Sequence, residues 1–368
     1  MDTQSDKPRV LIFSLRNIFG SALNRGPHYE FEDIICEIDS AELVAPKLDP
    51  SGRRSSFATR LAYHAPVLLN PGIPRVSAKG PYDVLFTICS FPQDLIMFNA
   101  VDNLKDLCKT SVCVLDEVWV KEMVKHRHFL RILDKFDVVM PFQIQTVKPL
   151  SELIGRECVH LPLGVDAIQF CPFPDPPERV VDVYSIGRRS NITHEKLLDM
   201  VRDSGLFYLY DSIGGSQAIS LKEHRTLFAN VAKRSRYFIV NPGKFDEPDE
   251  TGKQIEFGYR YLEGAASGAI MIGERPNNEL FPRLFDWPDA VIRLPYDSSD
   301  IDRVIKDLDA DPERQDRLRR TGVAQALMRH DWVYRWEAIL GAVSLEPMQG
   351  MLQRKDRLRN LADAVSRH

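Results

Sequence analysis

The 368-residue sequence predicts an α/β protein with two doubly wound, Rossmann-like domains in tandem. Short apolar or β-branched runs alternate with amphipathic stretches, which is typical of βαβ units around a parallel sheet. A proline-dense stretch interrupts this alternation, and the same alternation then restarts. We therefore expect a first domain at residues 1–169, a linker at 170–180, a second domain at 181–330 and a helical tail at 331–368.

Six apolar runs predict the strands of the first domain. They cover residues 9–15, 41–46, 82–88, 111–116, 137–142 and 158–163. Helical periodicity between these runs predicts helices over 57–69, 94–107 and 121–136. The stretch "GSALNRGP", which precedes His28, is expected to be the loop after the first strand.

The linker "FCPFPDPPERV" is rich in proline, which cannot continue a helix or a central strand. After it, five runs predict the strands of the second domain, at 181–187, 207–213, 236–242, 269–274 and 290–295. The helices expected between them cover 193–205, 222–235 and 256–268. Beyond residue 299 the chain is charged and helical in pattern.

The composition is that of an ordinary globular enzyme, with 44% hydrophobic and 27% charged residues. A formal net charge of -4 gives no basic field for phosphate backbones, which argues against nucleic acid as the main partner. Six scattered cysteines without a CxxC pair predict reduced thiols. With a polar N-terminus and no apolar run of about 20 residues, we expect a cytoplasmic protein without a transmembrane segment. The sequence neither shows nor excludes peripheral membrane contact, and it leaves the oligomeric state open.

Ligands of open α/β sheets bind at the carboxyl ends of the strands, so tandem domains predict a site in the cleft between them. The turn "SIGRRSN" follows the first strand of the second domain and precedes a helix. It offers Gly187 for a tight turn, the guanidiniums of Arg188 and Arg189, and the hydroxyl of Ser190, which together suit a diphosphate. The alternative interpretation is a solvated basic turn with Thr193 as helix N-cap.

The stretch "GYRYLEGAASGAIMI" (258–272) places Arg260 and Glu263 one helical turn apart, just before a run of small residues. A carboxylate there can accept hydrogen bonds from the two hydroxyls of a ribose. The alternative is an i, i+3 ion pair between Arg260 and Glu263 on the helix surface, worth only tenths of a kcal/mol.

Three segments of the chain resemble the GT-B glycosyltransferases, in a family 1/4-like form closer to the CgeB-like branch. "HLPLGVDAIQFCPFP" resembles their hinge, "YSIGRR" their phosphate-binding turn and "FGYRYLEGAASGAIMI" their donor-binding helix. The resemblance implies transfer of a sugar from a nucleoside-diphosphate sugar to a hydroxyl acceptor bound by the first domain. The donor-binding residues that it implies are Gly187, Arg188, Arg189, Ser190, Asn241, Gly258, Tyr259, Arg260 and Glu263. It also implies that the helix in "HDWVYRWEAIL" (330–340) crosses back onto the first domain.

The sequence departs from this family pattern at two points. The pattern has two glutamates with seven residues between them, but here Glu256 and Glu263 have six between them, and Ile255 stands at the position of the first glutamate. The lysine expected about five residues after Arg188 is absent. Our hypothesis is that Arg260 compensates by reaching the diphosphate.

The acceptor side offers two candidate catalytic positions. Asp116 and Glu117 end the run "VCVLDE", where a carboxylate can act as base or orient the acceptor. His28, after the first strand, is the other candidate for contact with acceptor or phosphate. For each residue the alternative is a helix cap or a solvent-facing side chain.

The charged stretch between residues 243 and 257 is interpreted either as plain surface or as a lid that orders over the bound sugar. No DxD-like motif stands near the donor helix, so we expect no obligatory metal and no cofactor, with arginines and helix dipoles stabilising the leaving diphosphate. Two other functions stay open: a nucleotide-sugar epimerase of the same fold, and a degenerate, non-catalytic binding protein.

Overall fold

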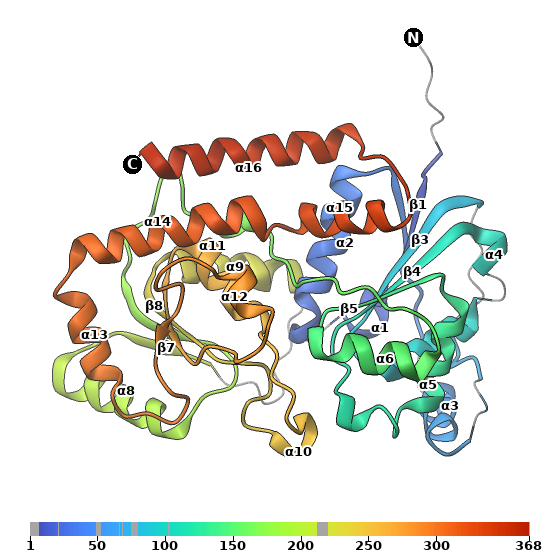
Figure 1. Cartoon of the computed structure of the whole chain (residues 1–368), viewed down its shortest axis with the longest axis horizontal. Coiled ribbons are helices and arrows are strands. Elements are labelled where there is room, and N and C mark those ends of the chain that lie inside the picture. Colours follow the sequence, from blue (N-terminus) through green and yellow to red (C-terminus); the bar gives the residue numbers. More distant parts are fainter. Residues whose placement is uncertain are drawn as a thin grey trace, which may run out of the picture.

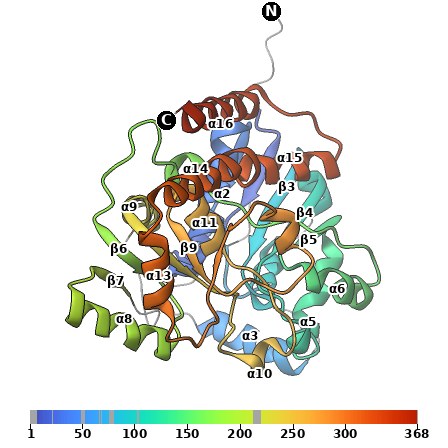
Figure 2. The same cartoon turned by 60° about the vertical axis from the view of Figure 1, so that its left-hand side comes forward.

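The computed structural model describes residues 7–367 apart from 21, 49–52, 66, 68, 75–79, 102–103 and 212–219. In this part of the chain, two five-stranded parallel sheets form the centres of two lobes that lie side by side (Figure 1). Helices cover both faces of each sheet, and a layer of long helices from the C-terminal part lies along one side of both lobes (Figure 2). This is the α/β architecture of paired Rossmann-like lobes that the alternation in the sequence predicts.

The first sheet has the order β2-β1-β3-β4-β5. Its strands are β1 (Val10–Phe13), β2 (Ala41–Val44), β3 (Tyr82–Cys89), β4 (Cys108–Leu115) and β5 (Val138–Pro141). The chain runs from β1 outward to β2 and then returns to the other side of β1 to form β3, so the strand order reverses between β1 and β3. Ligand crevices form at such reversal points, at the carboxyl ends of the strands.

The helices of the first lobe differ widely in length. The α-helices are α1 (Arg16–Phe19), α2 (Gly26–Ile38), α3 (Arg53–His64), α4 (Leu104–Leu107), α5 (Arg127–Leu130), α6 (Val147–Ile154) and α7 (Ala167–Phe170). The 3₁₀ helices are η1 (Leu23–Arg25), η2 (Pro92–Ala100), η3 (Val120–Glu122), η4 (Arg131–Lys135) and η5 (Ile144–Thr146).

The expected strand at 158–163 is wrong. Val159 and Leu161 do donate backbone hydrogen bonds to the carbonyls of Val139 and Pro141, at alternate residues as a strand would. The next donor in this alternation would be Leu163, but β5 ends at Pro141, so the ladder goes no further. The apolar pattern was therefore correct about burial but not about secondary structure.

The continuous helices expected over 94–107 and 121–136 are also wrong, since each range is divided among short helices. The first contains most of η2 and then α4, and the second contains η3, α5 and η4. The Asp94 carboxylate accepts hydrogen bonds from the backbone N–H groups of Ser90 and Phe91 and thereby closes a tight turn at the start of η2. Local side-chain to backbone hydrogen bonds of this kind compete with a regular helix.

The second sheet has the order β10-β9-β8-β6-β7. Its strands are β6 (Val181–Ser185), β7 (Tyr208–Tyr210), β8 (Ser235–Val240), β9 (Ile270–Gly273) and β10 (Ile292–Arg293). Its helices are α8 (Asn191–Ser204), α9 (Leu221–Lys233), α10 (Pro248–Thr251), α11 (Tyr259–Ser267), α12 (Phe281–Leu284), α13 (Ile301–Asp309) and α14 (Pro312–Arg329). All five expected runs contain a strand, although the end of the run 207–213 lies outside the described residues.

The polypeptide between α7 and β6, which contains the proline-rich linker, has no helix or strand. The exact domain boundaries stay a prediction. Among the described residues, no helix has the length and apolar character that crossing a membrane requires. The six cysteines are free thiols, and only Cys36 is exposed.

Two C-terminal helices, α15 (Trp332–Ala342) and α16 (Gln349–Arg367), connect the lobes (Figure 1). The fully buried ring of Trp332 stacks on Phe31 of α2, with ring centroids 4.5 Å apart and an interplanar angle of 10°. The indole of Trp336 donates a hydrogen bond of 2.8 Å to Asp39. The expectation that the tryptophan-containing helix returns to the first domain is confirmed, and α16 then runs back over α14.

Replacement of Gly164 by alanine tests how closely the hinge packs on α15. A Cβ at this position would lie 2.3 Å from the Trp332 ring, which is itself held by the stack on Phe31. We expect Gly164→Ala to lower the free energy of unfolding by about 1–3 kcal/mol in denaturant titrations, as overpacking does. Gly341→Ala is the control: a Cβ there meets no atom within 4 Å, so we expect stability to be unchanged or raised. Equal effects of the two substitutions would contradict the close packing.

Candidate active site

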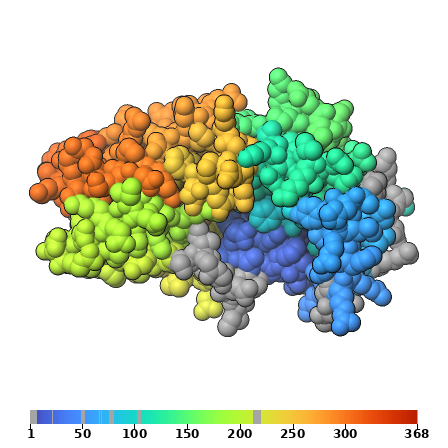
Figure 3. Space-filling model, turned by 90° about the horizontal axis from the view of Figure 1, so that it is seen from below, coloured from blue at the N-terminus to red at the C-terminus, as the bar shows by residue number. Residues whose placement is uncertain are grey.

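A cavity of about 660 Å³ lies between the two lobes and is lined by both. The first lobe contributes Asp116 and Trp119, and the second contributes Gly187, Asn241 and Tyr259. These residues follow strands β4, β6 and β8 or begin α11, so the carboxyl ends of both sheets face the same space. Figure 3 shows the blue-to-green first half and the yellow-green-to-orange second half of the chain meeting along one seam. The volume is within the range of small-molecule sites, about 300–1,000 Å³.

The two acceptor-side candidates, His28 and Asp116, lie in direct contact. His28 Nε2 and Asp116 Oδ2 are 2.7 Å apart, and Ser90 Oγ lies 3.1 Å from His28 Nδ1. Because a carboxylate only accepts, Nε2 carries the proton that it donates to Asp116, and the serine hydroxyl is the hydrogen-bond partner of Nδ1. The histidine side chain is 2% exposed and that of Asp116 14%, so the carboxylate faces the cavity and the imidazole supports it from behind.

His28 follows the expected loop directly, and the last two residues of that loop, Gly26 and Pro27, already belong to helix α2. His28 occupies the first turn of α2, whose start is marked by Pro27. Proline is favoured at the first helical position because its missing N–H has no partner there in any case, and this is the sequence signal that the loop assignment overlooked. The hydroxyl of Tyr259 from α11 donates to the same oxygen, Asp116 Oδ2, over 3.4 Å, so both lobes contact this carboxylate.

Glu117 lies beside Asp116 in the cavity wall and is bound to the second lobe. The Lys244 ammonium is 3.3 Å from its Oε2 and lies over the ring of Trp119. Burial raises the pKa of Glu117, and the neighbouring Asp116 charge raises it further, while Lys244 opposes both. The lysine thus spans the cleft and compensates the charge of a partly buried carboxylate of the first lobe.

Only part of the turn expected to bind the donor diphosphate lines the cavity. Gly187 and Arg188 line the cavity, with Gly187 at φ +94°, a conformation that favours glycine. Arg189 and Ser190 do not line it: the Arg189 guanidinium lies over the ring of Tyr210, and Ser190 caps α8 by accepting from the Thr193 N–H. The N-cap is therefore Ser190 and not Thr193.

The carboxylate of Glu263 is completely buried and lies behind the cavity wall. Arg225 NH1 donates to its Oε1 and Arg260 NH1 to its Oε2, so the ion pair of the alternative interpretation is present and has a second arginine. Its contact with a ribose stays a prediction, and it requires the side chains that cover Glu263 to move, because the residue is 0% exposed. Among the other candidates, Asn241, Gly258, Tyr259 and Arg260 do line the cavity.

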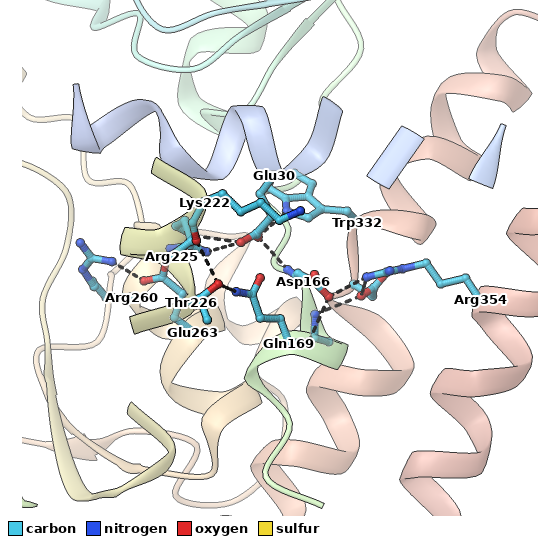
Figure 4. A network of polar contacts seen from close by, with 12 residues as sticks. Glu30, Asp166, Gln169, Lys222, Arg225, Thr226, Arg260, Glu263, Trp332 and Arg354 are labelled. Carbon is cyan, nitrogen blue, oxygen red and sulfur yellow. Dashed lines mark hydrogen bonds and ion pairs between the residues drawn. The ribbon is translucent and has the colours of Figure 1, made fainter. Parts of the chain in front are cut away.

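Arg225, which the sequence analysis overlooked, connects the donor helix to the first lobe (Figure 4). This residue of α9 donates from Nε to Glu30 Oε2 of α2 over 2.9 Å and from NH1 to Glu263 of α11. The other oxygen of Glu30 accepts from Trp332 Nε1 at 3.0 Å and from the Asp166 N–H in the hinge at 2.8 Å. One buried network thus joins both lobes, the hinge and α15.

The pKa values in this network follow its geometry. Burial raises the pKa of Glu30 in spite of the attraction of Arg225. Burial acts in the same direction on Glu263, but Arg260 and Arg225 together outweigh it and hold the pKa of Glu263 below its ordinary value. Glu263 therefore carries a full negative charge, which fixes the Arg260 guanidinium at the edge of the cavity.

A second connection between the lobes is made by residues 254–256, just before the donor helix. The Val120 N–H donates to Gln254 Oε1 at 3.0 Å, and Gln254 Nε2 donates to Thr146 Oγ1 at 2.9 Å. Glu256 Oε1 accepts from the Gln145 N–H at 3.0 Å, and burial raises the pKa of Glu256 to about 7. Within the described part of the chain, no group of three or more His, Cys, Asp or Glu side chains is arranged to hold a metal ion.

Comparison with known proteins identifies the class of this fold. Residues 216–341 match the family model described as glycosyl transferase-like, a range that includes Arg225, Arg260 and Glu263. No curated protein sequence matches the chain. The resemblance of the sequence to glycosyltransferases of this class is confirmed, whereas the CgeB-like branch stays a prediction.

Three solved structures share the fold at low sequence identity. A glycosyltransferase from Rickettsia africae ESF-5 is 9% identical, with a TM-score of 0.51, 92% of this chain covered and 98% of that chain. HepE from Anabaena in complex with UDP-glucose is 12% identical, with a TM-score of 0.52 and coverages of 91% and 99%. An alpha-glucosyltransferase in complex with UDP-glucose and DNA containing an abasic site is also 12% identical, with a TM-score of 0.52 and coverages of 91% of this chain and 99% of that chain. The chain has the GT-B fold, and its second lobe carries the glycosyl transferase-like domain.

Removal of the Arg225 charge tests the buried network. Arg225→Met leaves Glu30 and Glu263 buried without their shared partner, so we expect the free energy of unfolding to fall by about 3–5 kcal/mol. The triple variant Glu30→Gln, Arg225→Met, Glu263→Gln removes the unpaired charges as well. It should recover a large part of that loss in the same denaturant titration, and a triple variant as unstable as the single one would contradict the electrostatic account.

The raised pKa of Glu256 predicts a pH dependence of stability. A carboxyl whose folded pKa of about 7 exceeds its ordinary value of 4.5 stabilises the fold when protonated, and this contribution is lost as pH rises from about 4.5 to 7. Glu256→Gln removes the titration but retains an acceptor oxygen. Relative to the wild type, its free energy of unfolding should increase by up to roughly 3 kcal/mol between pH 5 and pH 8. A difference independent of pH would contradict the shift.

Proposed function

We propose that this protein is a glycosyltransferase that moves a sugar from a nucleoside-diphosphate sugar to a hydroxyl acceptor. The observation that carries the proposal is the cavity between the lobes, which has Gly187 and Arg188 on one side and the Asp116–His28 pair on the other. The glycosyl transferase-like domain and the UDP-glucose bound by two proteins of the same fold support this assignment. Uridine diphosphate is therefore the first donor nucleotide to test.

Asp116 is the proposed general base. Its Oδ2 is held by His28, and its side chain faces the cavity, where it can take the proton of an acceptor hydroxyl as that oxygen bonds to the anomeric carbon. His28 is then a positioning residue that acts through Asp116. The bond from the sugar to the diphosphate breaks in the same transfer, and the pair of electrons leaves with the diphosphate.

The charge of the leaving diphosphate requires cations on the second lobe. Arg188 and Arg260 line the cavity, where carboxylates hold both guanidiniums, so these two arginines are placed to bind phosphate oxygens. We propose that these arginines act without an obligatory metal or cofactor, and that the enzyme works in the cytoplasm. Turnover that is lost on chelation with EDTA and restored by a divalent cation would contradict the metal-independent mechanism.

Calorimetric titration with UDP, GDP, ADP and TDP tests the site, and we expect one of them to bind. With the corresponding sugar nucleotide, Asp116→Asn should retain the dissociation constant but lower the transfer rate by about 10²–10⁴-fold, the usual contribution of a general base. Asp134→Asn, an exposed carboxylate on η4, is the matched control and should leave both quantities unchanged. Conversion of the sugar nucleotide without any acceptor would favour the epimerase, and binding without turnover across an acceptor panel would favour the non-catalytic protein.

A further inference from the structure

The guanidinium of Arg188 is already occupied by two carboxylates of the chain itself. Its NH1 lies 3.0 and 3.1 Å from the two oxygens of Asp246 and 2.7 Å from Glu247 Oε1. Both acids precede α10, on the charged segment that follows β8. The cation proposed for the donor diphosphate is therefore bound to anions in the absence of donor.

A third carboxylate completes the anionic surroundings of this turn. Asp211, after β7, accepts the backbone N–H of Gly187 at 2.9 Å. One guanidinium and one backbone N–H thus serve three carboxylates, and Asp211 and Asp246 line the cavity beside Gly187 and Arg188. A diphosphate that approaches this turn meets groups of its own sign and competes with the acids of the segment for Arg188.

The segment that carries Asp246 and Glu247 is also attached to the first lobe. Lys244, which has φ +49°, pairs with Glu117 and with Glu250 of α10, and Lys121 of the first lobe donates to the Asp249 carbonyl. At its far end the segment is held by residues 254–256, which bond to the first lobe. Release of the two acids from Arg188 would therefore remove their ion pairs with the second lobe, while the contacts of the segment with the first lobe remain.

We propose that Asp246 and Glu247 are internal competitors of the donor diphosphate, which occupy its cation in the empty enzyme and set the affinity for the donor. This inference rests on the proposed function and adds residues to the same site. Phosphate oxygens match the guanidinium fork as carboxylates do, so donor binding exchanges one anionic partner of Arg188 for another. The exchange frees the segment between β8 and α11 from the second lobe.

Competition between these carboxylates and the diphosphate has a calculable effect on the dissociation constant of the donor. If the acids leave Arg188 free for about one tenth of the time, the apparent dissociation constant is about tenfold higher than that of the open site. Removal of both charges should then lower the dissociation constant for UDP by about tenfold. This gain in affinity should persist at 0.5 M NaCl, because salt screens charges in direct contact less than charges that are far apart.

The experiment compares UDP binding to the wild type, Asp246→Asn, the double variant Asp246→Asn, Glu247→Gln, and Asp249→Asn by calorimetry. Asp249 is the matched control: its substitution removes the same charge from the same segment, but its carboxylate is exposed, and the Arg188 guanidinium pairs with Asp246 and Glu247 instead. We expect tighter binding in the first two variants and a change of less than twofold in the control. Hydrogen exchange of residues 243–253 in the wild type should become faster with UDP.

The outcomes separate this inference from the function on which it rests. If UDP binds to the wild type but Asp246→Asn and the double variant bind it equally or more weakly, the acids do not compete and the inference is wrong, while the proposed function stands. An equal gain in Asp249→Asn would also overturn it, because the effect would then be one of general charge. If neither UDP nor GDP, ADP and TDP binds to any variant, the proposed function fails and the inference fails with it.

Discussion

The buried guanidinium of Arg225, shared by Glu30 of one lobe and Glu263 of the other, is the interaction on which the arrangement of the cleft depends. Buried charges are tolerated only when they are paired and hydrogen-bonded, so neither glutamate can leave this arginine without a large loss of free energy. Glu30 lies on α2, in the same helical turn as His28. Glu263 lies on α11, about one helical turn after Tyr259. His28 and Tyr259 are the two residues that contact Asp116. Arg225 therefore aligns the supports of the proposed base from both sides.

The two lobes have a second connection, at the surface of the cleft, which is made largely by charged side chains. The Arg225 network, Trp332 and the hinge at Asp166 form a buried joint on one side of the cavity. The segment from Lys244 to Glu256 lies on the other side and is held mainly by ion pairs and backbone hydrogen bonds that are partly exposed. The ion pairs at the surface can break and let the two lobes separate there, while the buried Arg225 network keeps the lobes in the same relative orientation. Such a movement suits an enzyme that must admit a donor and then exclude water.

Much of the fold could be predicted from the alternation of apolar and amphipathic runs, because the inner strands of both parallel sheets are largely buried on both faces. The prediction was wrong at 158–163, where the pairing stops because β5 ends at Pro141. It was also wrong at 94–107 and 121–136, which are divided among short helices, in the first case beside the local hydrogen bonds of Asp94. His28 and Asp116 were each predicted from strand ends, but their contact joins residues 88 positions apart and no local pattern contains it. Arg225 did leave a signal, since it shares the buried face of α9 with Phe228, Ala229 and Ala232, where an arginine requires a buried partner. The burial of Glu263 behind two arginines could not be predicted, because Arg225 comes from a different helix.

The central claim is that a nucleoside diphosphate binds in the cavity between the lobes with its phosphates at Arg188 and its sugar site toward Asp116. A crystal structure of the complex with UDP tests it most directly. The account predicts phosphate oxygens within hydrogen-bond distance of the Arg188 guanidinium, Asp246 and Glu247 turned away, and the Asp116 carboxylate facing the space beyond the terminal phosphate. A nucleotide bound outside the cavity, or one whose diphosphate contacts neither Arg188 nor Arg260, would contradict it.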